Sequence, residues 1–262
     1  MFPLHDENPT ELTPYVTIAL IALNVAAWFY LEGAGYDDQV LYSTICSWGL
    51  IPAELTGMTG GYRGIELAPG VPCVFREGNW LSIGTSMFLH GSWLHLIGNV
   101  WFLWVFGNNI EDSMGHFRYL VFYLLCGVLA ALAHIYSQPD SMIPTVGASG
   151  AISGIMGAYL VLYPRVRVQT LFWIVIFVRI IPIPAWAVLI QWFVLQFFYW
   201  MTSAGGAAST GGIAVWAHIG GFVAGLVLVK VFENRKLVRA RLEARRRREL
   251  GGGDPGPGGG WR

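Results

Sequence analysis

The chain has 262 residues, of which 55% are hydrophobic and 12% are charged, and its formal net charge is zero. A soluble domain carries about 25% charged residues, so this composition argues against a soluble globular enzyme and indicates a protein that folds in a lipid bilayer. The charges are also unevenly placed, because eight of the sixteen Lys and Arg residues lie between Arg235 and Arg248. This basic tail lacks interleaved aromatic residues and a recognisable binding motif, which argues against a nucleic-acid partner.

The amino-terminal segment, residues 1–14, contains Asp6, Glu7 and Glu11 but no Lys or Arg. A cleavable signal peptide begins with a positively charged region. We therefore expect the first apolar run to remain as a membrane anchor, with residues 1–14 as a short cytoplasmic amino terminus.

Six apolar runs then approach the roughly 20 residues that a membrane-spanning helix needs. They predict an all-α membrane protein, a bundle of six transmembrane helices over residues 15–232. The stretch from Val168 to Ile181 is shorter, holds Arg179 and leads into Pro182, so we interpret it as an interfacial or re-entrant segment. The Gly- and Ser-rich run "TSAGGAASTGG" marks a polar turn before the sixth span. The six runs are Tyr15–Leu31, Leu94–Ile110, Tyr119–Tyr136, Ala148–Tyr163, Pro184–Met201 and Ile213–Phe232.

The placement of Lys and Arg predicts the orientation of these spans. Residues 233–262 begin strongly basic and end in a flexible Gly/Pro-rich stretch, so we expect a cytoplasmic tail drawn to anionic lipid by about 1 kcal/mol per cation. Six spans then put both termini in the cytoplasm, and residues 32–79 become a long extracytoplasmic first loop. The expected location is the plasma membrane of a prokaryote.

The three cysteines fall in different surroundings. Cys126 lies in an apolar run, where we expect a buried thiol. Cys46 and Cys73 share the long polar loop, and they can form a disulfide only if that loop faces an oxidising compartment. The sequence leaves this pairing open.

Four polar groups inside the spans are predicted to reach one depth, and intramembrane polar groups are costly enough to suggest function. His95 and Asn99 lie near the start of the second span, and Ser149 opens the fourth. His218 lies about five residues into the sixth, roughly 8 Å at 1.5 Å per residue. Each residue alone is better explained by helix packing or interhelical hydrogen bonds.

Together these groups suggest chemistry. Ser149 and His218 supply a nucleophile and a base. His95 and Asn99 are four residues apart, so they share one helix face and can donate hydrogen bonds to a developing oxyanion. The backbone amide of Ser149, at a helix start, adds a third donor.

Glycines offer a way to bring the fourth and sixth spans together. Gly221 and Gly225 share the side of the sixth span that carries the histidine. The fourth span offers a matching strip of small residues, Gly150, Gly154 and Gly157. Helices lined with glycine can approach until their backbones nearly touch.

Three motifs in order, "HGSWLHLIGN", "GASG" and "HIGGFVAG", resemble the signatures of the rhomboid family, and the similarity covers roughly Thr85 to Lys230. The resemblance implies a six-helix fold, a Ser149–His218 dyad, and His95 and Asn99 as oxyanion-hole side chains. It also implies transmembrane protein substrates that enter from the lipid past the fifth span. The residues expected to support the site are His90, Gly147, Gly150, Gly221 and Gly225.

Two positions depart from the family pattern. Many members carry an aromatic residue four positions after the nucleophile, packed on the histidine, and Ser153 stands there in this chain. The adjacent Trp-Arg pair of some relatives is also missing from the outer loop, where Arg76 and Trp80 come nearest to it.

We therefore expect an intramembrane serine endopeptidase that works through an acyl-enzyme, without metal or cofactor. The acid Asp140 lies in a loop, so a dyad is predicted. A metalloprotease is disfavoured because no His-Glu-x-x-His motif is present, and a transporter because no acidic relay or inverted repeat is visible. The alternative is a catalytically silent rhomboid-like protein that binds membrane-protein clients.

Overall fold

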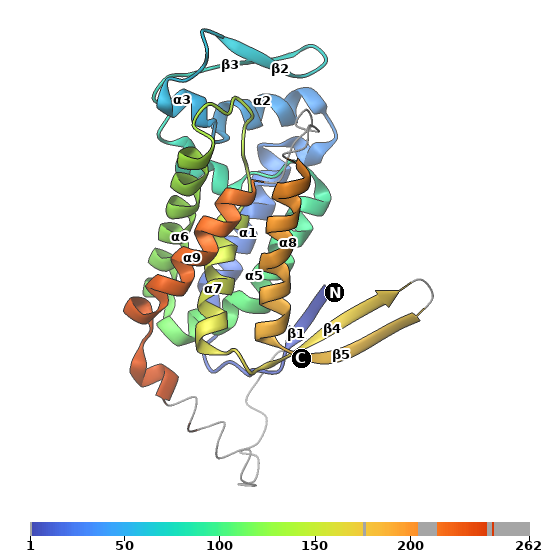
Figure 1. Cartoon of the computed structure of the whole chain (residues 1–262), viewed down its shortest axis with the longest axis vertical. Helices are drawn as coiled ribbons and strands as arrows, with labels where there is room; N and C mark the ends of the chain where they lie inside the picture. The colour runs from blue at the N-terminus through green and yellow to red at the C-terminus, as the bar shows by residue number, and fades with distance from the viewer. Residues whose placement is uncertain (1, 175–176, 204–213, 240–242, 244–262) are drawn as a thin grey trace.

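Figure 1 shows the computed structural model of the chain, which describes residues 2–174, 177–203, 214–239 and 243. Two predictions fall largely outside these residues. One is the polar turn in the run "TSAGGAASTGG", and the other is the flexible Gly/Pro-rich end of the tail.

Each of the six apolar runs coincides with one long helix. The helices are α1 (Tyr15–Tyr30), α5 (Trp93–Met114), α6 (His116–Ser137), α7 (Ser149–Leu162), α8 (Ala185–Ser203) and α9 (Val215–Phe232). Prolines set two of the boundaries, since α7 ends shortly before Pro164 and α8 begins directly after Pro184. A residue that precedes proline is pushed away from the helical region.

Among the residues that the structure describes, α6 and α9 are long and apolar enough to cross a bilayer. The apolar helices α1, α7 and the first part of α8 are shorter. The structure thus gives a bundle of apolar helices, and the number of membrane crossings stays a prediction.

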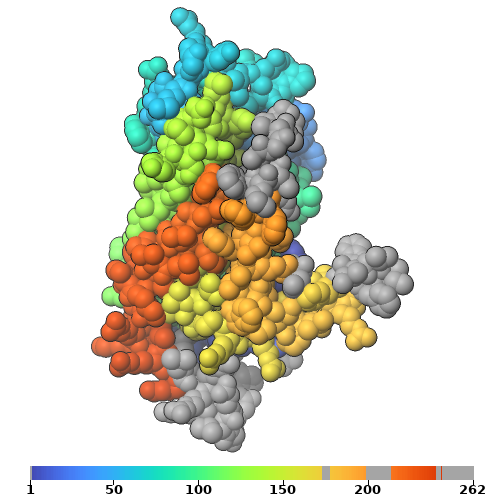
Figure 2. Space-filling view, viewed as in Figure 1, coloured from blue at the N-terminus to red at the C-terminus, as the bar shows by residue number. Residues whose placement is uncertain are grey.

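Helix α7 lies at the centre of the bundle and contacts α5, α6, α8 and α9. Residues 150–159 of this helix are all buried, as expected for a helix that is apolar on every side. Helices α8 and α9 lie side by side on the face seen in Figures 1 and 2. Helix α8 turns many large apolar side chains outward: Trp186, Ile190, Val194, Leu195, Phe197 and Phe198.

The first loop is folded and covers the upper end of the bundle in Figure 1. Its main helix, α2 (Asp38–Trp48), is capped by the Asp37 carboxylate, which accepts hydrogen bonds from the backbone N–H groups of Gln39 and Val40. The remaining elements are η1 (Gly33–Gly35), α3 (Pro52–Thr56), β2 (Gly64–Ala68), β3 (Val71–Val74), α4 (Ser82–Thr85) and η2 (Ser86–Phe88).

A disulfide between Cys46 and Cys73 joins α2 to the β2–β3 hairpin, and it decides the pairing that the sequence left open. Cys126, in α6, is a buried free thiol.

In the first loop, the backbone N–H of Arg76 donates a hydrogen bond to the buried Glu54 carboxylate. Trp80, the other residue compared with the Trp-Arg pair of some relatives, is exposed.

The opposite end of the bundle holds a three-stranded antiparallel sheet in the order β1-β4-β5. Its strands are β1 (Phe2–Asp6), β4 (Arg167–Ile174) and β5 (Phe177–Pro184). The all-α prediction was therefore wrong for these segments. The β4–β5 stretch is rich in β-branched and aromatic residues, which suit a strand, and its two arms pair with each other instead of re-entering the bundle. Figure 2 shows the hairpin projecting beside the helices.

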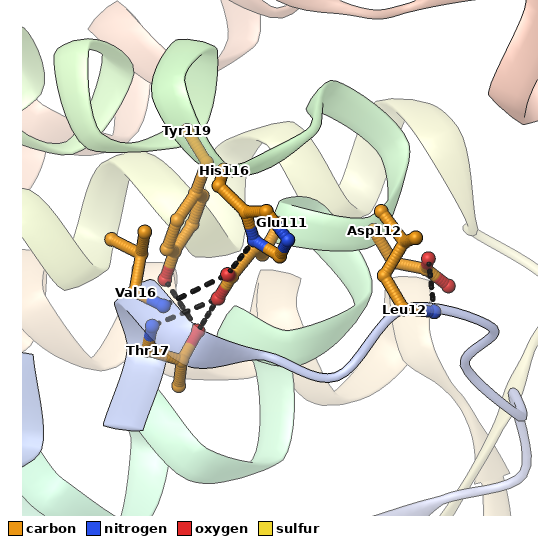
Figure 3. A network of polar contacts seen from close by, with 7 residues as sticks. All are labelled: Leu12, Val16, Thr17, Glu111, Asp112, His116 and Tyr119. Atoms are coloured by element: carbon orange, nitrogen blue, oxygen red, sulfur yellow. Dashed lines mark hydrogen bonds and ion pairs between the residues drawn. The ribbon is translucent and has the colours of Figure 1, made fainter. Parts of the chain in front are cut away.

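At this end, two carboxylates of α5 hold the start of α1 (Figure 3). Glu111 accepts hydrogen bonds from the backbone N–H groups of Val16 and Thr17 and from the Thr17 hydroxyl. Asp112 accepts the N–H groups of residues 11–12. Helix α1 has no side-chain cap of its own at its first residue, so α5 supplies partners for its unpaired amides. These contacts fix α1 against the helix that carries His95.

Candidate active site

Ser149 is the first residue of α7, and His218 lies in the first turn of α9. The backbone N–H of His218 donates to the carbonyl of Ala214 at 3.2 Å, which starts this helix. The Ser149 Oγ and the His218 Nε2 are 2.7 Å apart, although 69 residues separate them in the chain. A hydroxyl and an imidazole at hydrogen-bond distance have the geometry that proton transfer from a serine nucleophile requires.

Glycines on the facing sides of α7 and α9 make this short distance attainable. A Cβ atom on Gly221 would lie 2.0 Å from the carbonyl oxygen of Gly150, and one on Gly225 would lie 1.9 Å from that of Gly154. A Cβ atom on Gly157 would lie 2.2 Å from a carbonyl oxygen of α9. The two backbones are therefore in direct contact, which is the packing that small residues permit.

Gly147 stands two residues before the nucleophile and has a φ of +129°, a conformation that side-chain-bearing residues rarely adopt. A Cβ atom there would lie 2.7 Å from the His95 Nε2 and 3.4 Å from the Ser149 Oγ. The His95 ring and the Ser149 hydroxyl thus face one small space across a residue that must be glycine.

The orientation of His95 is set at the start of α5. The Ser92 Oγ caps this helix by accepting the backbone N–H of His95 at 3.2 Å. The backbone N–H of Gly91 points at the His95 Nδ1 at 3.4 Å. A ring nitrogen that accepts a hydrogen bond carries no hydrogen in neutral imidazole, so the hydrogen of His95 is on Nε2. That hydrogen is directed toward Gly147.

Asn99, one turn further along α5, is only 6% exposed. Its Nδ2 atom is buried and has no hydrogen-bond partner within the described part of the chain. Buried donors are usually paired, so this amide is available to a ligand. Helix α7 also has no side-chain cap, because its N-cap residue is Ala148. The amides of its first turn are then further donors at the same place.

His90 is fully buried and packs its ring edge-on against His95, with ring centroids 5.1 Å apart. The backbone N–H of His90 donates to the Glu32 Oε1 at 2.7 Å. Burial raises the pKa of Glu32 from 4.5 to about 7, and the hydrogen bond from His90 opposes part of the rise. Burial, aided by the neighbouring His95, lowers the pKa of His90 to about 3, so His90 is a neutral packing partner of His95.

Sequence reasoning missed two residues beside His218. The Oε1 of Gln196 lies 2.9 Å from the His218 Nδ1, and the Trp192 ring centroid lies 5.7 Å from that of the imidazole. Both belong to α8, where a spacing of four places them on one face. The signal for Gln196 was an amide inside an apolar run. Ser153 stands where many family members carry an aromatic residue. Its hydroxyl donates a hydrogen bond to the backbone carbonyl of Ser149 at 2.6 Å.

A small cavity of about 30 Å³ is lined in part by Ser149. Its lining combines apolar residues with Gly147 and the polar residues Ser86 and Thr145. A site of this size with polar groups can hold a water molecule. This cavity is therefore large enough for one water molecule close to Ser149.

A family model described as "Rhomboid domain" matches residues 77–235, which is more than half of the chain and contains all three motifs. The Rhomboid protease GluP of Bacillus subtilis (strain 168) is 32% identical over 147 residues, 56% of this chain and 24% of that protein. The Rhomboid protease AarA of Providencia stuartii is 29% identical over 167 residues, 59% of this chain and 53% of that protein.

The mitochondrial Rhomboid protein 1 of Saccharomyces cerevisiae (strain ATCC 204508 / S288c) is 28% identical over 151 residues, 56% of this chain and 40% of that protein. In each of these comparisons the match spans less than two thirds of the relative's own length.

Proposed function

The chain belongs to the rhomboid family of integral membrane proteins, and we propose that it is an intramembrane serine endopeptidase that cleaves transmembrane segments of other proteins. The observation that carries the proposal is the 2.7 Å distance between the Ser149 Oγ and the His218 Nε2. Two of the relatives above carry the word protease in their names, which supports the same reaction class.

In the proposed first step, His218 Nε2 takes the hydroxyl proton as the Ser149 Oγ attacks the scissile carbonyl carbon. The tetrahedral intermediate then collapses, the C–N bond breaks, and His218 gives the proton to the leaving amine. The product of this step is an ester between Ser149 and the substrate.

Three donors support the oxyanion in this mechanism: the His95 Nε2–H, the Asn99 amide and the Ser149 backbone N–H. The tautomer of His95 and the unpaired Nδ2 of Asn99 favour this role. Loss of one oxyanion donor typically lowers kcat about 10²–10³-fold.

Water from the cavity close to Ser149 is proposed to attack the ester carbonyl carbon while His218 accepts its proton. His218 then returns this proton to the Ser149 Oγ as the ester C–O bond breaks and the carboxylic acid product leaves. All of these steps use oxygen and nitrogen groups of the protein, so the mechanism requires no metal and no cofactor. Asp140 lies in the loop between α6 and α7. We therefore propose no acid as a third catalytic residue, and the catalytic pair is the nucleophile Ser149 with the base His218.

We propose that substrates are transmembrane proteins that reach the site from lipid past α8. The outward-facing apolar side chains of α8 and the contacts of this helix with α7 and α9 support that route. The proposed setting is the plasma membrane of a prokaryote, with cytoplasmic termini and six crossings, where the basic tail meets anionic lipid.

The test compares wild-type protein with Ser149→Ala in liposomes that contain a fluorescent single-span substrate. We expect the substitution to lower cleavage by about 10³-fold or more, since removal of a nucleophile disables the whole catalytic unit. Ser137→Ala, at the end of α6, is the matched control and should cleave like wild type. Cleavage that survives in Ser149→Ala contradicts the proposal.

The alternative, a silent client-binding protein, has a distinct outcome in the same preparation. A fluorophosphonate probe should label the wild-type chain and fail to label Ser149→Ala and His218→Ala. If wild-type protein takes no label and cleaves nothing, but still retains membrane-protein clients, the silent alternative is supported.

A further inference from the structure

Both ring nitrogens of His218 have a partner, and the two partners come from different helices. Nε2 faces the Ser149 hydroxyl at 2.7 Å, and Nδ1 faces the Oε1 of Gln196 on α8 at 2.9 Å. An amide oxygen can only accept a hydrogen bond, so the hydrogen of the neutral imidazole lies on Nδ1. Nε2 is then left with a lone pair directed at the hydroxyl that it must deprotonate.

The surroundings of Gln196 indicate that this contact is maintained. The Gln196 side chain is only 6% exposed, and a buried amide without a hydrogen bond costs about 1–3 kcal/mol. The imidazole therefore supplies a partner that the amide needs. Trp192, on the same face of α8, packs its ring at 43° against the imidazole. One helix thus restrains His218 by a hydrogen bond and by a ring contact.

We propose that Gln196 is the positioning residue that completes a Ser149–His218–Gln196 array, by fixing the Nδ1-protonated tautomer of His218. The proposal rests on the proposed protease function. Gln196 takes the structural place of a triad acid but brings no negative charge, so it orients the imidazole and stabilises the imidazolium only through its dipole. The ring contact of Trp192 replaces the aromatic residue that is missing at Ser153.

The protonation of the His218 imidazole also depends on the titratable groups around it. Within the described residues, the titratable side chains that influence His218 are His95 on α5 and His134 on α6, and both are partly or fully buried. Neither is an acid that supplies a negative charge to the ring. A carboxylate introduced at position 196 would therefore be a new charge, and its effect on pH dependence reports directly on the contact with Nδ1.

The experiment measures kcat, KM and the pH–rate profile for wild type, Gln196→Leu and Gln196→Glu with a single-span substrate in liposomes. In Gln196→Leu we expect kcat to fall about 10²-fold or more with KM within about twofold, because a wrong tautomer can cost up to about 10⁴ in kcat. In Gln196→Glu we expect kcat within about tenfold of wild type and an acid limb that moves to higher pH, because a carboxylate stabilises the imidazolium.

The matched control is Gln191→Leu, which removes a half-buried amide from another side of the same helix and should leave kcat and the acid limb unchanged. A wild-type kcat in Gln196→Leu, or an acid limb that does not move in Gln196→Glu, overturns the proposal. If Gln196→Leu does not fold, Gln196→Glu alone decides.

A measurement independent of activity separates this inference from the proposed function. In ¹⁵N spectra of histidine-labelled protein, the signals of His218 are those that disappear in His218→Ala. We expect a proton on Nδ1 in wild type and in Gln191→Leu, and its loss in Gln196→Leu. A wild-type His218 protonated on Nε2 refutes the positioning role, whereas absence of Ser149-dependent cleavage with the Nδ1 proton in place refutes only the protease.

Discussion

Two histidines of this site are held as opposite kinds of hydrogen-bonding group. His95 accepts a backbone N–H at Nδ1, so its Nε2 is a donor. His218 faces an amide oxygen at Nδ1, so its Nε2 is an acceptor. In the proposed mechanism, histidine therefore serves both as an oxyanion donor and as a base, and the hydrogen-bond partner of Nδ1 decides which role each Nε2 takes.

Glu32 gives a pH test at the scale of one residue. Its raised pKa means that the folded protein holds this proton between pH 4.5 and about 7, where the unfolded chain has released it. The stabilisation is complete below pH 4.5 and is lost as pH rises to about 7, by at most about 1.4 kcal/mol per pH unit. We expect Glu32→Gln, which keeps the acceptor for His90, to remove this slope.

The measurement is the midpoint of thermal unfolding in detergent from pH 4.5 to 7.5. Buried histidines such as His90 have lowered pKa values and produce the opposite slope, so the informative quantity is wild type minus Glu32→Gln. That difference should decrease steadily as pH rises. Parallel curves for the two proteins would show that Glu32 releases its proton at the usual pH.

At the scale of elements, the contact between α7 and α9 is tested by adding a single methyl group. In Gly221→Ala the new Cβ atom would lie 2.0 Å from the backbone oxygen of Gly150, so the helices must separate. We expect a loss of about 1–3 kcal/mol in stability and about 10²-fold lower labelling by fluorophosphonate, since small misplacements of reacting groups have effects of that size.

The control for this variant is Gly98→Ala in the interior of α5, where a Cβ atom would meet no heavy atom within 4 Å. Alanine is favoured over glycine inside a helix by about 1 kcal/mol, so stability should be equal or higher. If the two alanine variants have the same unfolding midpoint and the same labelling rate, the close contact between α7 and α9 does not support the site.

The long helices and the glycine contact were predictable because each depends on a local or periodic pattern. The apolar runs predicted the helices, and the spacing of glycines in the fourth and sixth spans predicted that these two helices pack closely. The β1–β4–β5 sheet was not predictable from apolarity, since the same residues suit lipid and a strand. The contact of Gln196 with His218 depends on how α8 rotates and docks, which its composition does not encode.

The whole molecule has two chemically different ends. The disulfide-linked loop, with carboxylates at Asp37, Asp38, Glu66 and Glu77, covers the end nearest Ser149. The other end carries basic residues near the start of α6, between α7 and β4, at the start of β4, near the end of α9 and in the tail: Arg118, Arg165, Arg167, Lys230 and Arg235. Basic residues favour the cytoplasmic side of a membrane, and disulfides persist in oxidising compartments. The basic residues at one end and the disulfide at the other therefore predict the same orientation of the protein in the membrane, on independent chemical grounds.

Counting thiols tests this orientation. If the end with Cys46 and Cys73 faces outward, protein that is isolated from cells, denatured and not reduced should take one maleimide, at Cys126. After reduction it should take three, because the chain has three cysteines. A Cys46→Ser/Cys73→Ser variant should take one in both conditions and lose about 2–4 kcal/mol in stability, because the closed loop no longer restrains the unfolded chain. Three labels without reduction would mean that this end faces a reducing compartment, and the proposed membrane topology would then be inverted.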